Sequence, residues 1–265
     1  MRKKFMREVA ALGLTRSPGP GVGVAPVTEA DLEPLPEAVK RYLRFMGVVG
    51  RPRDWSFRID FTGRFRMKPD EIWMMCEACQ YSSRLAVARI FYIRIRIGGI
   101  VPVLARDTYM EGRGRMRVRL LDHFTITDGT GEEFDIGELV TYLDDGVFIA
   151  PSMLLVPEVR WSHVDASSFD VELTDHGRTV RARVFVDQRG APVDFSTTDR
   201  FYADPKASRP VRARWTTPVE GWLETGDRRL WTRGQAVWHL PEGEFAYADL
   251  APVPGTLVFN VPPGE

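Results

Sequence analysis

The chain has little cysteine, little histidine and no net charge. Its 265 residues include 2 cysteines and 4 histidines, and 36 basic side chains balance 36 acidic ones. Two cysteines are too few for a disulfide framework. A balanced charge without a clustered basic run excludes a general attraction to nucleic acid, so we expect no nucleic-acid partner.

A long apolar run is also missing. No segment approaches the ~18 apolar residues that a membrane-spanning helix requires. The N-terminus is basic like that of a signal peptide, but the apolar run of residues 9–14 is shorter than the usual ~7–15 residues. We therefore expect no integral membrane segment and a cytoplasmic location.

One short motif is typical of metal or redox chemistry, the C-x-x-C formed by Cys76 and Cys79. Residues 72–79 alternate as in a strand, where positions three apart face opposite sides of the sheet. Two such thiols cannot share a zinc ion or close a disulfide. We interpret both as packed side chains and expect neither a metal nor another cofactor.

Glycine and proline are concentrated in residues 17–27, which predict a linker. It would join a loose N-terminal arm, residues 1–27, to a single domain, residues 28–265. Residues 28–47 predict a helix that begins at a capping pair, Thr28 with Asp31. From residue 54 to about 127, apolar and polar side chains alternate, which indicates antiparallel strands.

Residues 133–156 interrupt this alternation with two predicted helices, the first stopped by residues 144–146 and the second covering about 148–155. Strand patterns then return to the end of the chain. The order predicts an α+β fold. A large curved antiparallel β-sheet, a half-barrel, would pack around an N-terminal helix and two central helices.

Six segments follow one another along the chain: LPEAVKRYLRFMG, GRFRMKPDEIW, RDTYMEGRGRMRVRLL, GELVTYLDD, TTPVEGW and AVWHLP. Together they resemble an uncharacterised bacterial family, one of the domains of unknown function, over about residues 33–245. The order of elements is also similar to lipoprotein carriers of the LolA/LolB type. That second resemblance implies an incomplete β-barrel that surrounds helices and holds acyl chains.

Aromatic and branched apolar residues are the feature most typical of a binding site. If helices cover the curved sheet only in part, some of these side chains line a cavity, and otherwise all of them form a packed core. The expected pocket residues are Trp55, Phe57, Trp73, Phe91, Ile93, Ile95, Tyr109, Tyr142, Phe148 and Trp222.

Acid–base catalysis has three weak candidates, Asp107, Glu138 and His123. Such chemistry needs two groups in one cleft with separated pKa values. Arg106 adjoins Asp107 in the sequence, which favours a permanent ion pair over a general acid. No Gly-x-Ser-x-Gly or H-E-x-x-H motif is present to suggest another mechanism.

Three hypotheses of function follow. The first is non-catalytic binding of an apolar small molecule or lipid in a dry cavity between sheet and helices, with arginine at its mouth. The second is an enzyme in which at least two of the three acid–base candidates meet at one void. The third is a protein-interaction module that uses the polar sheet face and has no cavity.

Overall fold

The computed structural model describes residues 1–265 except 20–24, 204–208 and 227. One antiparallel sheet of 15 strands dominates it, in the order β6-β5-β4-β3-β2-β1-β16-β15-β13-β10-β9-β8-β7, with β14 on β15 and β17 on β1. The strands before helix α4 are β1 (Ser56–Phe65), β2 (Met74–Ser83), β3 (Ala88–Ile97), β4 (Val101–Met110), β5 (Arg113–Leu120) and β6 (Phe124–Thr130).

The strands after α4 return along the other half of the sheet. They are β7 (Val159–His163), β8 (Ser168–Asp175), β9 (Arg178–Val186), β10 (Pro192–Thr197), β13 (Arg214–Thr216), β14 (Val219–Thr225), β15 (Arg228–Leu240), β16 (Gly243–Pro252) and β17 (Val258–Phe259). A separate pair consists of β11 (Phe201–Tyr202) and β12 (Val211–Arg212). The two halves join where β1 pairs with β16.

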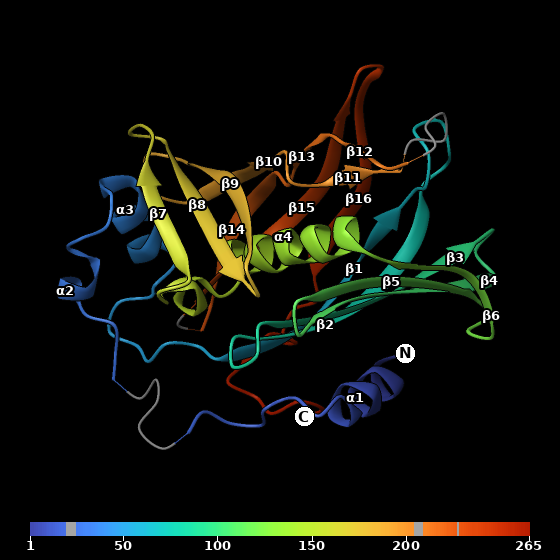
Figure 1. The fold of residues 1–265 in the computed structure, drawn as a ribbon, viewed down its shortest axis with the longest axis horizontal. Helices are drawn as coiled ribbons and strands as arrows, with labels where there is room; N and C mark the ends of the chain where they lie inside the picture. Colours follow the sequence, from blue (N-terminus) through green and yellow to red (C-terminus); the bar gives the residue numbers. More distant parts are fainter. Residues whose placement is uncertain (20–24, 204–208, 227) are drawn as a thin grey trace.

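The sheet curves around helix α4 (Glu132–Phe148), which lies between its two halves (Figure 1). Alternation explains this arrangement, because Phe57, Ile59 and Phe61 share one face of β1 and are all buried in the core around α4. The expected α+β fold with a curved antiparallel sheet is therefore confirmed. Among the described residues, no helix is long and apolar enough to cross a membrane.

The helical segments differ in part from expectation. The predicted helix at 28–47 is divided into α2 (Glu29–Leu32) and α3 (Glu37–Phe45), because Pro34 and Pro36 interrupt the backbone hydrogen bonding. The capping prediction is confirmed, since Thr28 and Asp31 form a complete capping box.

The predicted stop of the central helix at residues 144–146 is wrong, because α4 continues to Phe148. Asp144 and Asp145 are tolerated there since Thr217 and Arg89 donate hydrogen bonds to them. Gly146 lets Leu154 approach, since an added Cβ would lie 2.9 Å from that side chain. The second central helix is only a 3-10 turn, η1 (Pro151–Leu154).

The first part of the N-terminal arm is helical and packed, not loose. Helix α1 (Arg2–Ala11) packs on the convex face of the sheet, where Phe5 and Val9 are fully buried. The ring of Phe5 meets the edge of Tyr92 at a centroid distance of 5.1 Å. Part of the expected linker, residues 20–24, lies outside the described residues.

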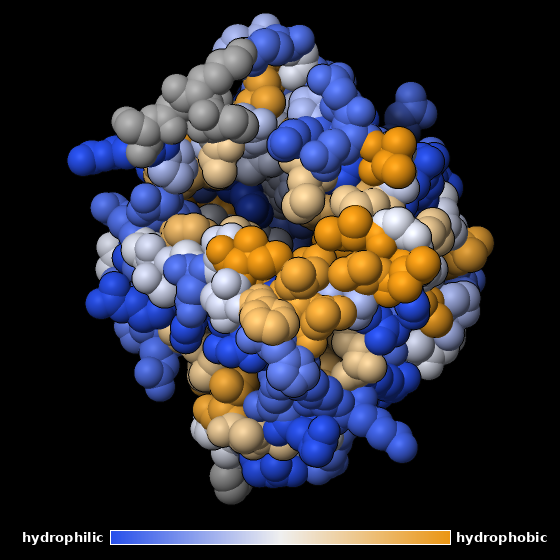
Figure 2. Space-filling view, turned by 90° about the vertical axis from the view of Figure 1, so that its right-hand side faces the viewer, coloured by the Kyte–Doolittle hydropathy of each residue, from blue (hydrophilic) through white to orange (hydrophobic). Residues whose placement is uncertain are grey.

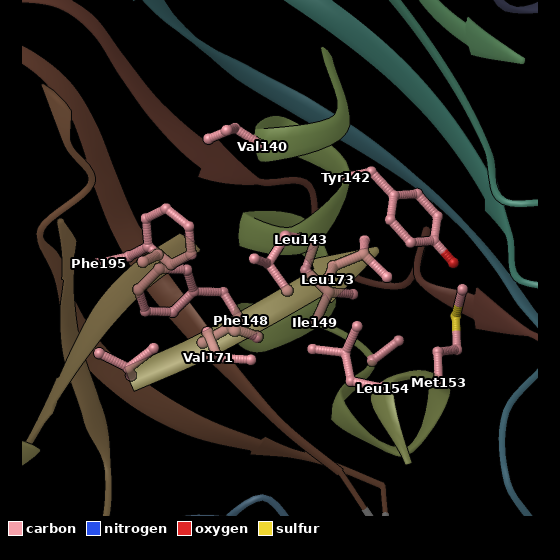
Figure 3. Packing of buried hydrophobic residues seen from close by; sticks show 14 of the residues in the cluster. Val140, Tyr142, Leu143, Phe148, Ile149, Met153, Leu154, Val171, Leu173 and Phe195 are labelled. Atoms are coloured by element: carbon pink, nitrogen blue, oxygen red, sulfur yellow. The ribbon is translucent and has the colours of Figure 1, made fainter. Parts of the chain in front are cut away.

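The C-terminal half of α4 is packed against the sheet by buried apolar side chains. Side chains from α4, η1, β8 and β10 interdigitate there, including Leu143, Phe148, Leu154, Val171 and Phe195 (Figure 3). Full burial of one such side chain contributes about 1.5–3 kcal/mol. The packed core therefore fills the concave face around the C-terminal half of α4. The concave face at the N-terminal end of α4 differs from it.

Candidate functional site

The concave face of the sheet is uncovered beyond the N-terminus of α4. The strands β3 to β6 extend past that end of the helix (Figure 1). On the concave face of β5, Met116, Val118 and Leu120 oppose Asp107, Ala105 and Val103 of β4, and the three β5 side chains remain partly exposed. Figure 2 looks at this end of the molecule and shows a hollow in the surface there.

Apolar side chains gather around this open end. The β1–β2, β3–β4 and β5–β6 connections lie at the same end of the sheet, because successive strands run in opposite directions. Nine of the 13 exposed large apolar residues of the described chain are found there. These nine form the apolar rim: Met67, Ile72, Met75, Ile97, Ile100, Val101, Leu121, Phe124 and Ile126.

Charged residues meet inside the curve of the sheet. Arg89 of β3, 4% exposed, donates to Asp145 Oδ2 at 2.6 Å and to Glu138 Oε2 at 3.1 Å. Gln80 of β2 donates to the same Asp145 oxygen at 2.7 Å. We call the following residues the acid–arginine cluster: Arg89, Asp107, Glu138, Asp144, Asp145 and Arg200.

The spacing along α4 explains how one helix supplies most of these acids. Glu138, Thr141 and Asp145 are three and four positions apart, so they share one face of the helix. The Arg200 guanidinium donates to the Thr141 hydroxyl from the segment between β10 and β11. Asp144, turned toward the other half of the sheet, accepts a hydrogen bond from Thr217 Oγ1 at 2.5 Å.

An aromatic wall adjoins the cluster. The Arg200 guanidinium lies over the Trp215 ring, 4.3 Å from its centroid. The Trp215 indole donates to the Tyr247 hydroxyl at 3.2 Å, and Tyr247 stacks on Trp238 at 6.3 Å. Phe65 meets the edge of Tyr247 at 5.6 Å. These rings extend from β13 to β1 across the join between the two halves of the sheet.

Burial controls the ionisation of the cluster. Removal from water raises the pKa of Glu138 to about 7, and the nearby Asp107 charge adds to this rise, whereas Arg89 and Arg200 oppose it. Burial also raises the pKa values of Asp107, Asp144 and Asp145. Asp107 Oδ1 is shielded from solvent and has no hydrogen-bond partner in the described part of the chain.

Four acids thus face two arginines, and Glu138, with its pKa raised to about 7, can hold a proton near neutral pH. Arg200 and a protonated carboxyl group donate hydrogen bonds, whereas an ionised carboxylate accepts them, so the cluster offers both donors and acceptors to a polar group. The arrangement can bind such a group or exchange a proton with it.

Two of the three predicted acid–base residues come together here, Asp107 and Glu138. His123 does not join them, because it is exposed on the β5–β6 turn, where its Nδ1 lies 2.7 Å from the Leu121 carbonyl oxygen. The expected pairing of Asp107 with Arg106 is wrong. Adjacent residues of a strand face opposite sides, and Arg106 contacts Glu8 and Asp122 on the convex face.

The predicted pocket residues are dispersed. Phe57, Ile93, Ile95, Tyr109, Tyr142 and Phe148 are buried in the core around α4, and Phe91 is only partly exposed. Trp73 lies under the guanidinium groups of Arg64 and Arg66. Trp222 packs against Phe45 of α3 with its ring centroid 5.5 Å away. Trp55 is partly exposed just before β1.

Sequence reasoning missed Arg89, Asp145, Arg200 and the aromatic wall. The inward orientation of Arg89 could have been predicted, because Arg89 shares the strand phase of Phe91, Ile93 and Ile95, which face the core. The position of Arg200 could not be predicted from a sequence pattern, because Arg200 lies in the irregular segment between β10 and β11.

The two cysteines face opposite sides of the sheet, as the alternation predicted. Cys76 lies in the core around α4, and Cys79 lies under α1 on the convex face. Burial raises the pKa of each thiol to about 12, so neither forms a thiolate at neutral pH. No group of three or more potential metal ligands was found in the part of the chain that the structure describes.

Three solved structures are similar to this chain. A LolA superfamily protein from Nitrosomonas europaea is 13% identical, with a TM-score of 0.43, and the match covers 88% of this chain and 93% of that one. A putative outer membrane lipoprotein-sorting protein domain from Vibrio parahaemolyticus is 11% identical (TM-score 0.42, coverage 77% and 85%). A DUF1329 family protein from Desulfovibrio piger is 12% identical (TM-score 0.43, coverage 89% and 95%).

No curated protein matches the chain. A family model does match it, over residues 25–250, which include α4, every residue of the acid–arginine cluster and the sheet apart from β17 and the last two residues of β16. The family resemblance seen in the sequence is thereby confirmed, and the chain belongs to the family of unknown function DUF6544.

Proposed function

We propose that this protein binds an amphiphilic small molecule or lipid, without catalysis, at the open end of the half-barrel. The apolar rim carries the proposal. Soluble monomeric proteins rarely expose a contiguous apolar surface unless it contacts a ligand, a membrane or a partner. Figure 2 shows apolar side chains beside the hollow at this end of the molecule, so a ligand with an apolar part would cover some of them on entry.

The interior determines which kind of apolar molecule fits. A dry cavity lined only by apolar side chains does not agree with the buried acid–arginine cluster. A molecule with a polar end does agree, because that end can exchange hydrogen bonds with Glu138, Asp107 and Arg200. Its apolar part would lie along the aromatic wall and the concave side chains of β5.

A matched pair of variants tests the role of the rim. In Phe124→Ser/Ile126→Ser, two rim side chains that are 67% and 60% exposed lose their apolar surface. We expect dansyl-undecanoic acid, followed by its fluorescence, to bind about tenfold more weakly, because part of the ~1.5–3 kcal/mol per buried side chain is lost. Leu223→Ser is the control, since Leu223 is 62% exposed on β14, outside the rim.

The control variant should bind the probe like the unmodified protein. An equal loss in both variants, or no binding of the probe to the unmodified protein, would contradict the proposal. Because all three residues are exposed, the fold should survive each change, which thermal unfolding verifies.

One observation favours the enzyme alternative, the raised pKa of Glu138 beside that of Asp107. A carboxyl group that titrates near neutral pH can serve as a general acid or base. Under this alternative, a molecule bound in the hollow would be chemically converted, and Glu138→Gln would abolish the conversion without abolishing binding.

A further inference from the structure

A second hollow, the arginine cleft, lies beside α3, which Figure 1 places at the other end of the molecule from the β3–β4 hairpin. It has a volume of about 570 Å³ and is bordered by Arg41, Arg44, Phe45, Arg189, Trp222 and Arg229, with Glu224 as its one acid. An adjoining cleft of about 320 Å³ shares Arg44, Glu224 and Arg229. The surface is thus strongly cationic in a chain of zero net charge.

The fold holds several of these groups in place. Arg41 and Arg44 are three positions apart on α3, so they lie on one face of the helix. The Arg229 guanidinium donates to the Phe45 carbonyl oxygen and lies 4.7 Å from the Phe45 ring centroid. Arg189, in the β9–β10 turn, lies 5.7 Å from the same centroid. Phe45 and Trp222 supply the apolar part of the wall.

The acids that pair with three of these arginines form ion pairs in which at least one side chain is exposed. Glu29 pairs with Arg44 at 2.7 Å and Glu224 pairs with Arg229 at 3.1 Å, with acid side chains that are 57% and 75% exposed. Asp187, 31% exposed, pairs at 3.0 Å with Arg189, whose own side chain is 70% exposed. Ion pairs between exposed side chains contribute little free energy, so a ligand can compete for these arginines.

Arg41 is the least compensated cation of the cleft. Its guanidinium donates to the backbone carbonyl of Ala166, and no carboxylate contacts it in the described part of the chain. Its Nε is shielded from solvent and has no hydrogen-bond partner there. The cleft therefore has donors available for an anion.

We propose that the arginine cleft is a binding site for a phosphomonoester that carries a small apolar group. A doubly charged phosphate accepts hydrogen bonds from several guanidinium groups at once, whereas a carboxylate is satisfied by one. The cleft volume lies in the range of small-ligand sites, about 300–1,000 Å³, and exceeds what phosphate alone requires. Phe45 and Trp222 would contact the apolar group.

Isothermal titration calorimetry with phenyl phosphate tests this proposal, with inorganic phosphate and benzoate as comparison probes. We expect phenyl phosphate to bind more tightly than either, and its affinity to fall as ionic strength rises. Arg41→Gln/Arg189→Gln should weaken binding about tenfold or more, since each guanidinium bond to a dianion is charge-assisted. Arg183→Gln is the control, because Arg183 pairs with Asp170 on β8, outside the cleft.

The single variant Arg189→Gln provides a second test of phenyl phosphate binding. The Arg189 side chain is 70% exposed, so its replacement should leave the fold intact. Three results would overturn the proposal: no binding of phenyl phosphate to the unmodified protein, binding no tighter than that of benzoate or inorganic phosphate, or the same affinity for the double variant as for the unmodified protein. Dansyl-undecanoic acid should bind the double variant normally, so failure here is distinguishable from failure of the rim proposal.

Discussion

Replacing Arg89 by methionine is expected to destabilise the protein by about 3–5 kcal/mol at pH 7, because a buried ion pair that loses one partner leaves its charge uncompensated. Arg89 is 4% exposed and contacts both Glu138 and Asp145. Methionine keeps much of the side-chain length, so the lost cation accounts for most of the effect.

Urea unfolding at pH 7 measures this loss of free energy. Arg183→Met is the matched control, because Arg183 and Asp170 form a partly exposed ion pair at 2.8 Å, which typically contributes about 0–1 kcal/mol. The destabilisation by Arg89→Met should shrink toward pH 5, since the carboxyl groups that lost their cation then accept protons. A loss no larger than that of the control would contradict the description of the cluster.

Replacing Glu138 by glutamine is expected to stabilise the protein above pH 7. The pKa of Glu138 is raised to about 7 in the folded state, so the folded state binds a proton more tightly than the unfolded state. Its contribution to stability is present below about pH 4.5 and is lost as the pH rises through 7. Glutamine stays neutral, and the variant should gain up to about 3 kcal/mol over the unmodified protein at pH 8.

Unfolding free energies measured between pH 5 and pH 8 check this prediction. The two proteins should be nearly equally stable at the acidic end and diverge as the pH rises. Glu77→Gln is the control, because hydrogen bonding to Arg94 lowers the pKa of that exposed carboxyl group. Parallel profiles for Glu138→Gln and the unmodified protein would show that Glu138 is not the group that titrates.

The strands could be predicted because a half-buried strand alternates in polarity, as the buried residues of β1 and β3 do. The capping box at Thr28 could also be predicted, since it depends only on residues close to it in the sequence. The C-terminal end of α4, at Phe148, could not be predicted from the sequence. Asp144 and Asp145 are acceptable inside the helix only because Thr217 and Arg89, distant in the sequence, reach them.

The candidate site was predictable only in part, for the same reason. Glu138 and Asp107 were identified, but their electrostatic partners came from β3 and from the segment after β10. The alternation of apolar and polar residues along a strand also does not distinguish the exposed residues of the apolar rim from the buried residues of the core. Ile95 and Ile97 share one strand phase, yet Ile95 is 5% exposed and Ile97 is 40% exposed, because α4 ends before it can cover the hairpin tip.

Native mass spectrometry of the full chain, purified without detergent and then extracted with organic solvent, tests the binding proposal most directly. The proposal predicts a mass above that of the bare chain and an amphiphile in the extract, with both reduced in Phe124→Ser/Ile126→Ser and retained in Leu223→Ser. A bare mass and an empty extract from the unmodified protein would contradict it.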